Sequence, residues 1–426
     1  MGRRKTGPAC PGQVSALRAP RSNRRQLAIT VLSILGMLLS LLAMQRSLGS
    51  RQCLVGSDFR ALYTGALMLR MGVRSDFYKL ATQYHWQHSF APELREQGHL
   101  MVFVNPPFVA LLTLPLSFLP FAAAYWVWAG ANVLLMLALA RVLLFSLADV
   151  SESKRLRALF LALTFLPVWV TVYQGQYSFI LAISLLMAWR ALARRQEAQA
   201  GLWLAALLIR PQLLPVPALL FIWWRRWRAL AGLALGAAAL LAVSLLAVGS
   251  RGLQGYVQLL QATLSWGDAF TMHPQRMYTW RSSLHLLMRT DNVQDIMGWW
   301  ALGSLAAIAL FLWACSKGTG PSAVQLDLQW ALAALVGLFV SPHANFHDLT
   351  LLLVPFFLLM RHGLPGGSAH ALALPARVLP AVAYFLAPAS LFLAPSLRIQ
   401  PVTCFLALAI VWLAWCARRL QPAPAS

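Results

Sequence analysis

The sequence predicts an all-α integral membrane protein, a polytopic bundle of about 10–12 transmembrane helices. Of the 426 residues, 59% are hydrophobic and only 11% are charged, whereas about a quarter of the residues of a soluble domain are charged. Roughly ten apolar stretches, each near the 20 residues that a spanning helix needs, are separated by short polar breaks. These observations exclude a soluble enzyme and predict one transmembrane domain over residues 26–420.

The strong basic excess fits a membrane protein. Lys and Arg number 35 against 12 Asp and Glu, which gives a net charge of +23. Because cytoplasmic loops collect Lys and Arg, this charge does not imply a nucleic-acid partner, and none is expected. The five cysteines form no CxxC pair, so neither a disulfide framework nor a zinc site is predicted.

The N-terminal region and the basic clusters predict the topology. Residues 1–25 carry seven Lys or Arg and no acid, and residues 26–44 are apolar without a small-residue cleavage site. This pattern predicts a cytoplasmic basic tail followed by a signal anchor in the inner (plasma) membrane. With the other basic clusters also cytoplasmic, both termini lie inside. The two long loops, 45–101 and 249–290, then lie outside, and the first of them has helical apolar spacing.

Two regions predict helices that break within the membrane. Residues 201–224 lie between two basic clusters and are too few for two full spans, so we expect a pair of short helices that meet at Arg210-Pro211-Gln212. Similarly, Asn105-Pro106-Pro107 is expected to start a half-embedded segment, and residues 121–145 then complete the crossing. Broken backbone persists at membrane depth only where protein or a water-filled cavity covers it. Several breaks on one side therefore predict one cavity at the outer face.

Asp58 is the acidic residue that stands out on the predicted outer side. It heads a run with helical apolar spacing, Ala61 to Met71. One interpretation is a helix N-cap, since Ser57 or Asp58 at this place can accept hydrogen bonds from free backbone N–H groups. The other is a catalytic carboxylate. Asn105-Pro106-Pro107 has a similarly plain interpretation as a helix start.

Basic and histidine residues suggest a phosphate site. Arg210 is flanked by apolar residues, which is costly in lipid and implies a partner, and a guanidinium matches phosphate bidentately. Snorkelling to the head groups is the alternative. His343 and His347 have the i, i+4 spacing of metal ligands, but Pro342 predicts a loop there, so no metal is expected. Aromatic and basic residues around Arg281 suit either a phosphate-sugar site or an interfacial belt.

Ordered motifs over residues 56–360 resemble glycosyltransferase family 87, the polyprenyl-phosphate-sugar-dependent transferases of the C-type glycosyltransferase superfamily. These motifs are Ser57-Asp58-Phe59 with Tyr63, Asn105-Pro106-Pro107-Phe108, Leu114-Pro115-Leu116, Leu119-Pro120, Gln174-Gly175-Gln176, Ala200-Gly201, Arg210-Pro211-Gln212, Arg225-Arg226-Trp227-Arg228-Ala229-Leu230 and Ser341-Pro342-His343. The sequence departs from the family at two places. Arg210 stands where a lysine is common before Pro-Gln, and residues 345–348 read Asn-Phe-His-Asp where paired His or Tyr-Asp forms are expected.

The resemblance implies a C-type glycosyltransferase-like fold with an extracytoplasmic (periplasmic) active site. Asp58 takes the family's role of general base on the first outer loop. The implied partners are membrane lipid, a polyprenyl-phosphate sugar, most commonly mannose, and a glycan or lipid-linked acceptor. A single inverting displacement needs no metal, nucleotide or other cofactor. The expected donor-phosphate residues are Arg210, Arg281 and His343, and the expected substrate-binding residues are Arg60, Tyr63, Asn105, Gln174, Gln176, Gln212 and His347.

Other functions compete with this one. A lipid-linked sugar transporter or flippase would also use broken helices and a buried arginine, but it should show repeated halves and polar groups through the span. A glycan ligase or polymerase would use the same chemistry with larger donors. A non-enzymatic membrane scaffold would not explain ordered motifs on one side.

Overall fold

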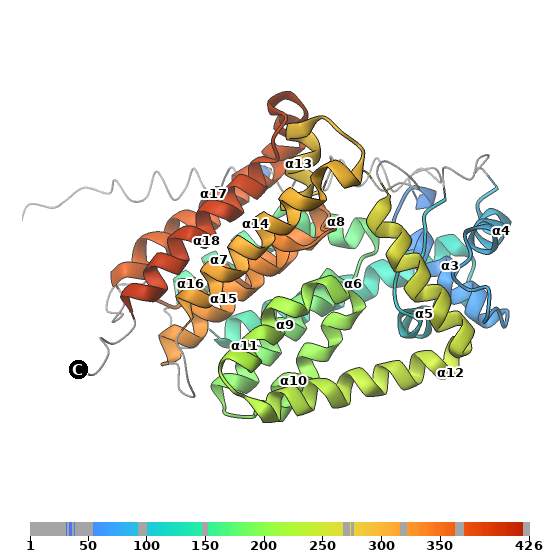
Figure 1. The fold of residues 1–426 in the computed structure, drawn as a ribbon, viewed down its shortest axis with the longest axis horizontal. Coiled ribbons are helices and arrows are strands. Elements are labelled where there is room, and N and C mark those ends of the chain that lie inside the picture. The colour runs from blue at the N-terminus through green and yellow to red at the C-terminus, as the bar shows by residue number, and fades with distance from the viewer. Residues whose placement is uncertain are drawn as a thin grey trace, which may run out of the picture.

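A computed structural model describes residues 54–92, 100–146, 152–266, 277–315, 322–362 and 370–420, with positions 31, 34, 35, 38 and 273 (Figure 1). The predicted tail 1–25 and nearly all of the predicted first span 26–44 lie outside these residues. The elements are α3 (Phe59–Arg70), α4 (Leu80–Phe90), α5 (Pro107–Thr113), η2 (Leu114–Phe118), α6 (Phe121–Ser146), α7 (Glu152–Thr164), α8 (Leu166–Gln174), α9 (Ser178–Ala193), α10 (Glu197–Ala205), η3 (Ala206–Ile209), η4 (Pro211–Leu213), α11 (Pro215–Trp223), α12 (Trp227–Ser265), α13 (Trp280–Met288), α14 (Val293–Ala314), α15 (Ala323–Val340), η6 (Phe346–Leu352), α16 (Leu353–Met360), α17 (His370–Leu397) and α18 (Pro401–Arg419).

The protein is a multi-pass all-α membrane protein, as the sequence predicts. In the described part of the chain, six helices are long and apolar enough to span a membrane, namely α6, α12, α14, α15, α17 and α18. Five shorter apolar helices of 10–17 residues accompany them. The predicted count of 10–12 spans therefore depends on these shorter helices and on residues 26–44.

The broken helices lie where the sequence places them. Residues 201–224 form two short helical arms that meet at Arg210, because Pro211 has no N–H to continue the first arm. Pro107 begins the short helix α5, and the long α6 follows after Leu119-Pro120. The first part of the expected outer loop 249–290 is helical. Helix α12 continues to Ser265, with only a kink at Gly249, whose φ is 71°.

Two glycines bring α10 and α12 into close backbone contact. A Cβ on Gly201 would lie 1.9 Å from the carbonyl oxygen of Ala229, and one on Gly232 would lie 2.0 Å from that of Ala198. Small residues allow this approach in membranes, where van der Waals packing replaces the hydrophobic effect between helices. The Ala200-Gly201 motif is therefore a helix-packing feature.

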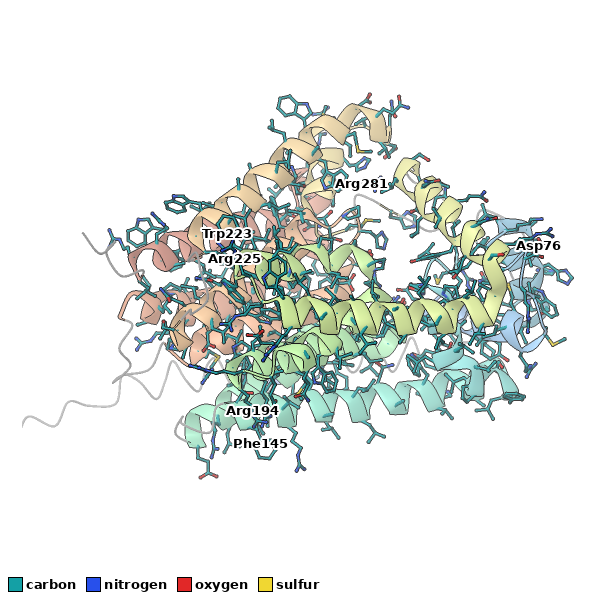
Figure 2. All side chains as sticks on the ribbon, turned by 60° about the horizontal axis from the view of Figure 1, so that its bottom comes forward. Asp76, Phe145, Arg194, Trp223, Arg225 and Arg281 are labelled. Atoms are coloured by element: carbon teal, nitrogen blue, oxygen red, sulfur yellow. The ribbon has the colours of Figure 1, made fainter. Side chains whose placement is uncertain are left out.

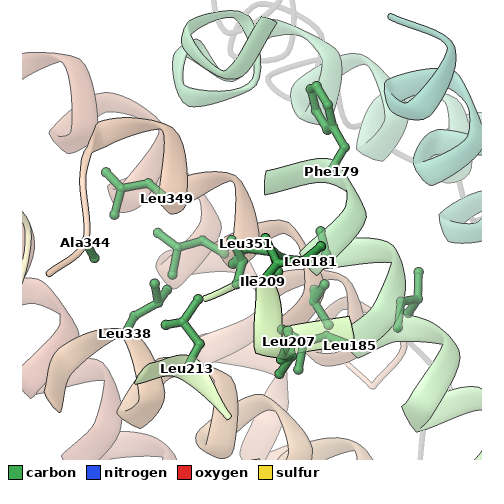
Figure 3. Packing of buried hydrophobic residues seen from close by; sticks show 14 of the residues in the cluster. Phe179, Leu181, Leu185, Leu207, Ile209, Leu213, Leu338, Ala344, Leu349 and Leu351 are labelled. Atoms are coloured by element: carbon green, nitrogen blue, oxygen red, sulfur yellow. The ribbon is translucent and has the colours of Figure 1, made fainter. Parts of the chain in front are cut away.

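Helix α15 forms the centre of the C-terminal bundle. It is buried along nearly its whole length and packs against α14, α16 and α18 (Figure 1). Figure 3 shows Leu338 of α15 close to Leu213, with Ile209 and Leu351 nearby. This apolar packing holds the break at Arg210 between the bundle and α9.

Helices α3, α4 and α5 lie together at one end, beside the second half of α12 (Figure 1). Two buried glutamines of α4, one helical turn apart, hold an extended segment against them. Gln87 accepts from the N–H of Met101 at 2.9 Å and donates to its carbonyl at 2.9 Å. Gln83 binds Phe103 in the same way, at 2.7 and 3.4 Å. Side-chain amides thus replace the neighbouring strand that an extended backbone normally needs.

Candidate active site

A cavity of about 490 Å³ lies between the α3 end of the molecule and the break at Arg210. Its polar lining includes seven of the eleven residues singled out from the sequence, namely Asp58, Asn105, Gln176, Arg210, Gln212, Arg281 and His343. Its apolar lining comes mainly from α3, residues 101–104 and the second half of α12, including Leu62, Val102, Val257, Leu260 and Leu264. The cavity therefore combines a polar, charged wall with an apolar one.

Asp58 reaches this cavity with its carboxylate available. It occupies the N-cap position of α3, but its side chain makes no capping hydrogen bond. Two glutamines hold it instead. Its N–H donates to Gln174 Oε1 at 3.0 Å, and Gln176 Nε2 donates to its Oδ2 at 2.7 Å. The side chain is 27% exposed. The structure thus removes the capping interpretation for this carboxylate.

Gly175 explains how both glutamines reach Asp58. It ends α8 with φ +68°, a left-handed conformation that glycine adopts without strain. A Cβ there would lie 2.7 Å from that of Phe59. Trp128 Nε1 donates to the Gly175 carbonyl at 2.6 Å. The tight turn therefore requires glycine and fixes Gln174 and Gln176 on either side of it.

Arg210 is buried at the centre of a charged network. Its Nη1 lies 3.3 Å from Asp348 Oδ2, and its Nη2 donates to Gln176 Oε1 at 3.1 Å. The same Nη2 lies 2.8 Å from His347 Nε2, and the guanidinium is 5.6 Å from the centre of the Tyr177 ring. This position excludes snorkelling to the head groups, since Arg210 is 8% exposed.

Asp348 is the principal residue of the site that was absent from the predicted set. It is fully buried at the start of η6, where its Oδ2 accepts from the N–H of Asn345 at 2.8 Å in a capping box. The Asn-x-x-Asp spacing of 345–348 is a recognisable signal for such a cap. This cap begins η6 and places both His347 and Asp348 beside Arg210.

Arg281 and His343 lie on another part of the wall. Arg281 Nη2 donates to the carbonyls of Leu264 and Trp266, both at 3.2 Å, and so caps the end of α12. Figure 2 shows Arg281 close to that end. Burial lowers the pKa of Arg281. Burial, and then the nearby Arg210 charge, lowers the pKa of His343, so its imidazole is neutral. Gln212 donates to the His343 carbonyl at 3.4 Å.

Asn105 is fixed from two sides by tyrosines. Tyr78 donates to its carbonyl at 2.6 Å, and the Tyr177 hydroxyl binds its Oδ1. Because the side-chain oxygen is occupied by a donor, the Nδ2 amide group is the remaining polar group of this cavity-lining side chain. Tyr177 was not anticipated from the sequence, although it directly follows Gln176.

Four predicted residues do not line the cavity. Gln174 contacts the backbone of Asp58 from behind, and His347 is 2% exposed. Tyr63 donates to the carbonyl of Leu119 at 2.8 Å within an aromatic cluster, and Arg60 is buried on α3. For these four, direct substrate contact is not supported by their positions.

Comparisons with known proteins agree with this arrangement. The model of glycosyltransferase family 87 matches residues 103–342, more than half of the chain. The chain belongs to glycosyltransferase family 87. The match covers Asn105, Gln176, Arg210 and Arg281, whereas Asp58 precedes it.

One curated relative supports the same family. Over 268 residues the family 87 chain is 26% identical to a polyprenol-phosphate-mannose-dependent alpha-(1-2)-phosphatidylinositol pentamannoside mannosyltransferase of Mycolicibacterium smegmatis. The alignment covers 61% of the chain and 61% of that relative. No solved structure matches the chain.

Proposed function

We propose that the chain is a membrane glycosyltransferase that transfers a sugar, mannose, from a polyprenyl-phosphate donor to an acceptor hydroxyl. Family membership supports transferase activity, and the relative's dependence on polyprenol-phosphate-mannose supports this donor class. The observation that carries the proposal is the position of Asp58, whose uncapped carboxylate shares one cavity wall with Arg210 and Arg281.

Asp58 acts as the general base in a single inverting displacement. The acceptor oxygen attacks the anomeric carbon, its proton passes to Asp58, and the bond between that carbon and the phosphate oxygen breaks. Polyprenyl phosphate leaves with the electron pair. A positioned base contributes about 10²–10⁴-fold to the rate, and fixed charges that stabilise the leaving group contribute more in a dry site.

Arg281 is the principal ligand of the donor phosphate. Its Nη2 is used for the end of α12, but its other guanidinium nitrogens make no hydrogen bond to the described residues. Arg210, in contrast, already binds Asp348, Gln176 and His347. Arg210 therefore adds positive charge and order to the wall, while His343 and Asn105 offer neutral polar contacts to the sugar or acceptor.

Transfer from labelled polyprenyl-phosphate sugars, with mannose first, tests this function in membranes that contain the protein. Asp58→Asn should abolish lipid-dependent transfer at equal protein level. The matched control is Asp76→Asn, since the Asp76 side chain is 50% exposed on the same predicted outer loop and pairs with Lys79 at 2.9 Å. An Asp58→Asn variant with undiminished transfer would contradict the base assignment, and a wild type inactive with every donor would contradict the activity.

The active site faces the extracytoplasmic side in this proposal, with both termini in the cytoplasm. Figure 2 shows Arg194 and Arg225, of the predicted cytoplasmic clusters, well separated along the long axis from Asp76 of the predicted outer loop. An Asp58→Cys variant, with Cys53 removed, should react with an impermeant thiol reagent in intact cells. Labelling only after permeabilisation would show that position 58 faces the cytoplasm, which is opposite to the proposed orientation.

A further inference from the structure

Two side chains connect Arg210 to Asp58 in parallel. Gln176 accepts from Arg210 Nη2 at 3.1 Å and donates to Asp58 Oδ2 at 2.7 Å. His347 approaches the same two groups, with Nε2 at 2.8 Å from Arg210 Nη2 and Nδ1 at 3.7 Å from Asp58 Oδ2. Both connections end on the same carboxylate oxygen.

The contact with Arg210 determines the protonation of His347. A guanidinium has donors only, so Nε2 of His347 must be the acceptor. The imidazole is then neutral and its proton lies on Nδ1, the nitrogen that faces Asp58. Asp348 Oδ2, at 3.5 Å from Nε2, would favour the opposite tautomer. Arg210 is nearer to Nε2 and itself pairs with that oxygen at 3.3 Å, so the Arg210 contact prevails.

The environment of His347 prevents direct contact with a substrate. Its side chain is 2% exposed and does not line the cavity. Thr171 of α8 donates to its backbone carbonyl at 3.2 Å, which ties η6 to the helix that ends at the Gly175 turn. The charged groups facing the ring are Asp58 from the start of α3, Arg210 from the helix break and Asp348 from η6.

We propose that His347 is a positioning residue for Asp58, held by Arg210 as the neutral Nδ1–H tautomer. This inference rests on the proposed function, in which Asp58 is the base. Gln176 holds Oδ2 through a hydrogen bond, and the N–H of His347, 3.7 Å from the same oxygen, attracts it electrostatically toward the protein. No described residue donates a hydrogen bond to Oδ1, so Oδ1 is the oxygen that takes the acceptor proton. His347 itself transfers no proton.

Two substitutions at His347 separate positioning from substrate binding. His347→Gln keeps an acceptor for Arg210 and a donor for Asp58, whereas His347→Leu keeps bulk and loses both. His347→Leu should lower kcat on the order of 10²-fold, the cost of a misplaced catalytic group, with KM for the donor nearly unchanged. His347→Gln should recover most of kcat. A rise in KM alone, or a Gln variant as impaired as the Leu variant, would overturn the proposal.

A spectroscopic measurement tests the tautomer without any activity. In ¹⁵N-histidine-labelled protein in lipid nanodiscs, the resonances missing from His347→Gln belong to His347, one of nine histidines. They should report a neutral Nδ1–H ring from about pH 5 to 8, the range in which an ordinary histidine titrates. A titrating ring or an Nε2–H tautomer would refute the inference. An inactive wild type with the expected tautomer would refute only the proposed function.

Discussion

Two aspartates with different surroundings show how this protein separates stability from chemistry. Asp327 lies near the start of α15, and Asp58 lies by the cavity to which the other end of α15 leads. Asp327 accepts from Trp189 at 2.7 Å, Arg361 at 2.9 Å and His362 at 2.8 Å, and its side chain is 3% exposed. Asp58 accepts at Oδ2 from Gln176 and is 27% exposed.

The number of hydrogen-bond donors around each carboxylate distinguishes the structural role of Asp327 from the catalytic role proposed for Asp58. Asp327 joins α9, α15 and the end of α16, with Arg361 also 4.9 Å from the centre of the Trp189 ring. Both of its oxygens accept hydrogen bonds from buried or half-buried side chains, so its contribution is to stability. Asp58 receives only enough donors to orient it, and one oxygen is left for a reacting hydroxyl.

The largest expected effect is on catalysis at Asp58. Asp58→Asn should lower the transfer rate by about 10²–10⁴-fold, the usual contribution of a general base. The thermal unfolding midpoint in detergent should barely change, because an amide can still accept from Gln176. A large fall in that midpoint would show that Asp58 stabilises the fold as Asp327 does, and would contradict the distinction between the two residues.

The reciprocal effect is expected at Asp327. Asp327→Asn should cost about 1.5–3 kcal/mol of folding free energy, the range for hydrogen bonds to charged groups. Thermal unfolding followed by size-exclusion detection would measure it, with activity expressed per folded molecule. Unchanged stability combined with a slower rate would show that the Asp327 cluster takes part in the reaction.

A glycine comparison tests the turn that orients Asp58. Gly175→Ala should cost about 1–3 kcal/mol through its left-handed backbone and its clash with Phe59, and should slow transfer by displacing both glutamines. Gly72→Ala is the matched control, since Gly72 has φ +75° and a Cβ added there would meet no atom within 4 Å. Equal losses of activity in both variants would mean that backbone strain alone matters.

Arg281 tests the contrast between its own guanidinium and that of Arg210, which already binds Asp348, Gln176 and His347. Arg281→Gln should raise KM for the polyprenyl-phosphate donor about tenfold, equivalent to roughly 1.4 kcal/mol. Arg251→Gln, an exposed position on α12, serves as the control. An unchanged KM for the donor in Arg281→Gln would contradict the assignment of Arg281 and would favour Arg210 as the phosphate ligand.

The smallest expected effect is a pH dependence of stability at His343. Its folded pKa is depressed, so below the ordinary value of about 6.5 the unfolded state binds more protons than the folded state. Stability should therefore be fully present above that value and decline as pH falls below it. His343→Asn should flatten this decline in unfolding midpoints measured across that range. An identical slope in both proteins would exclude His343 as the cause.

The sequence was informative about local structure and about much of the cavity wall. Proline and apolar spacing located the start of α3, the short helix that begins at Pro107 and the pair of short helices around Arg210. The second half of α12 was predicted as part of an outer loop, although Leu253, Val257, Leu260 and Leu264 have helical spacing.

Long-range pairing is what the sequence could not supply. Gln174 and Gln176 reach Asp58 across more than a hundred residues, and Asp348 meets Arg210 only after η6 packs on α8. Residue type alone also did not separate cavity-facing positions from buried ones. Tyr63 and His347 have side chains that suit sugar binding, yet both point into protein.

The glutamine pair of α4 has a consequence for how the cavity wall moves. Met101 and Phe103 donate their N–H groups to side chains, although they belong to no helix. Hydrogen–deuterium exchange should therefore be slow at these two amides and fast at Val102 between them. That alternation is the signature of a sheet edge. If Gln83→Leu also makes exchange fast at Met101, whose acceptor Gln87 is unchanged, one wall of the site opens without any helix unfolding.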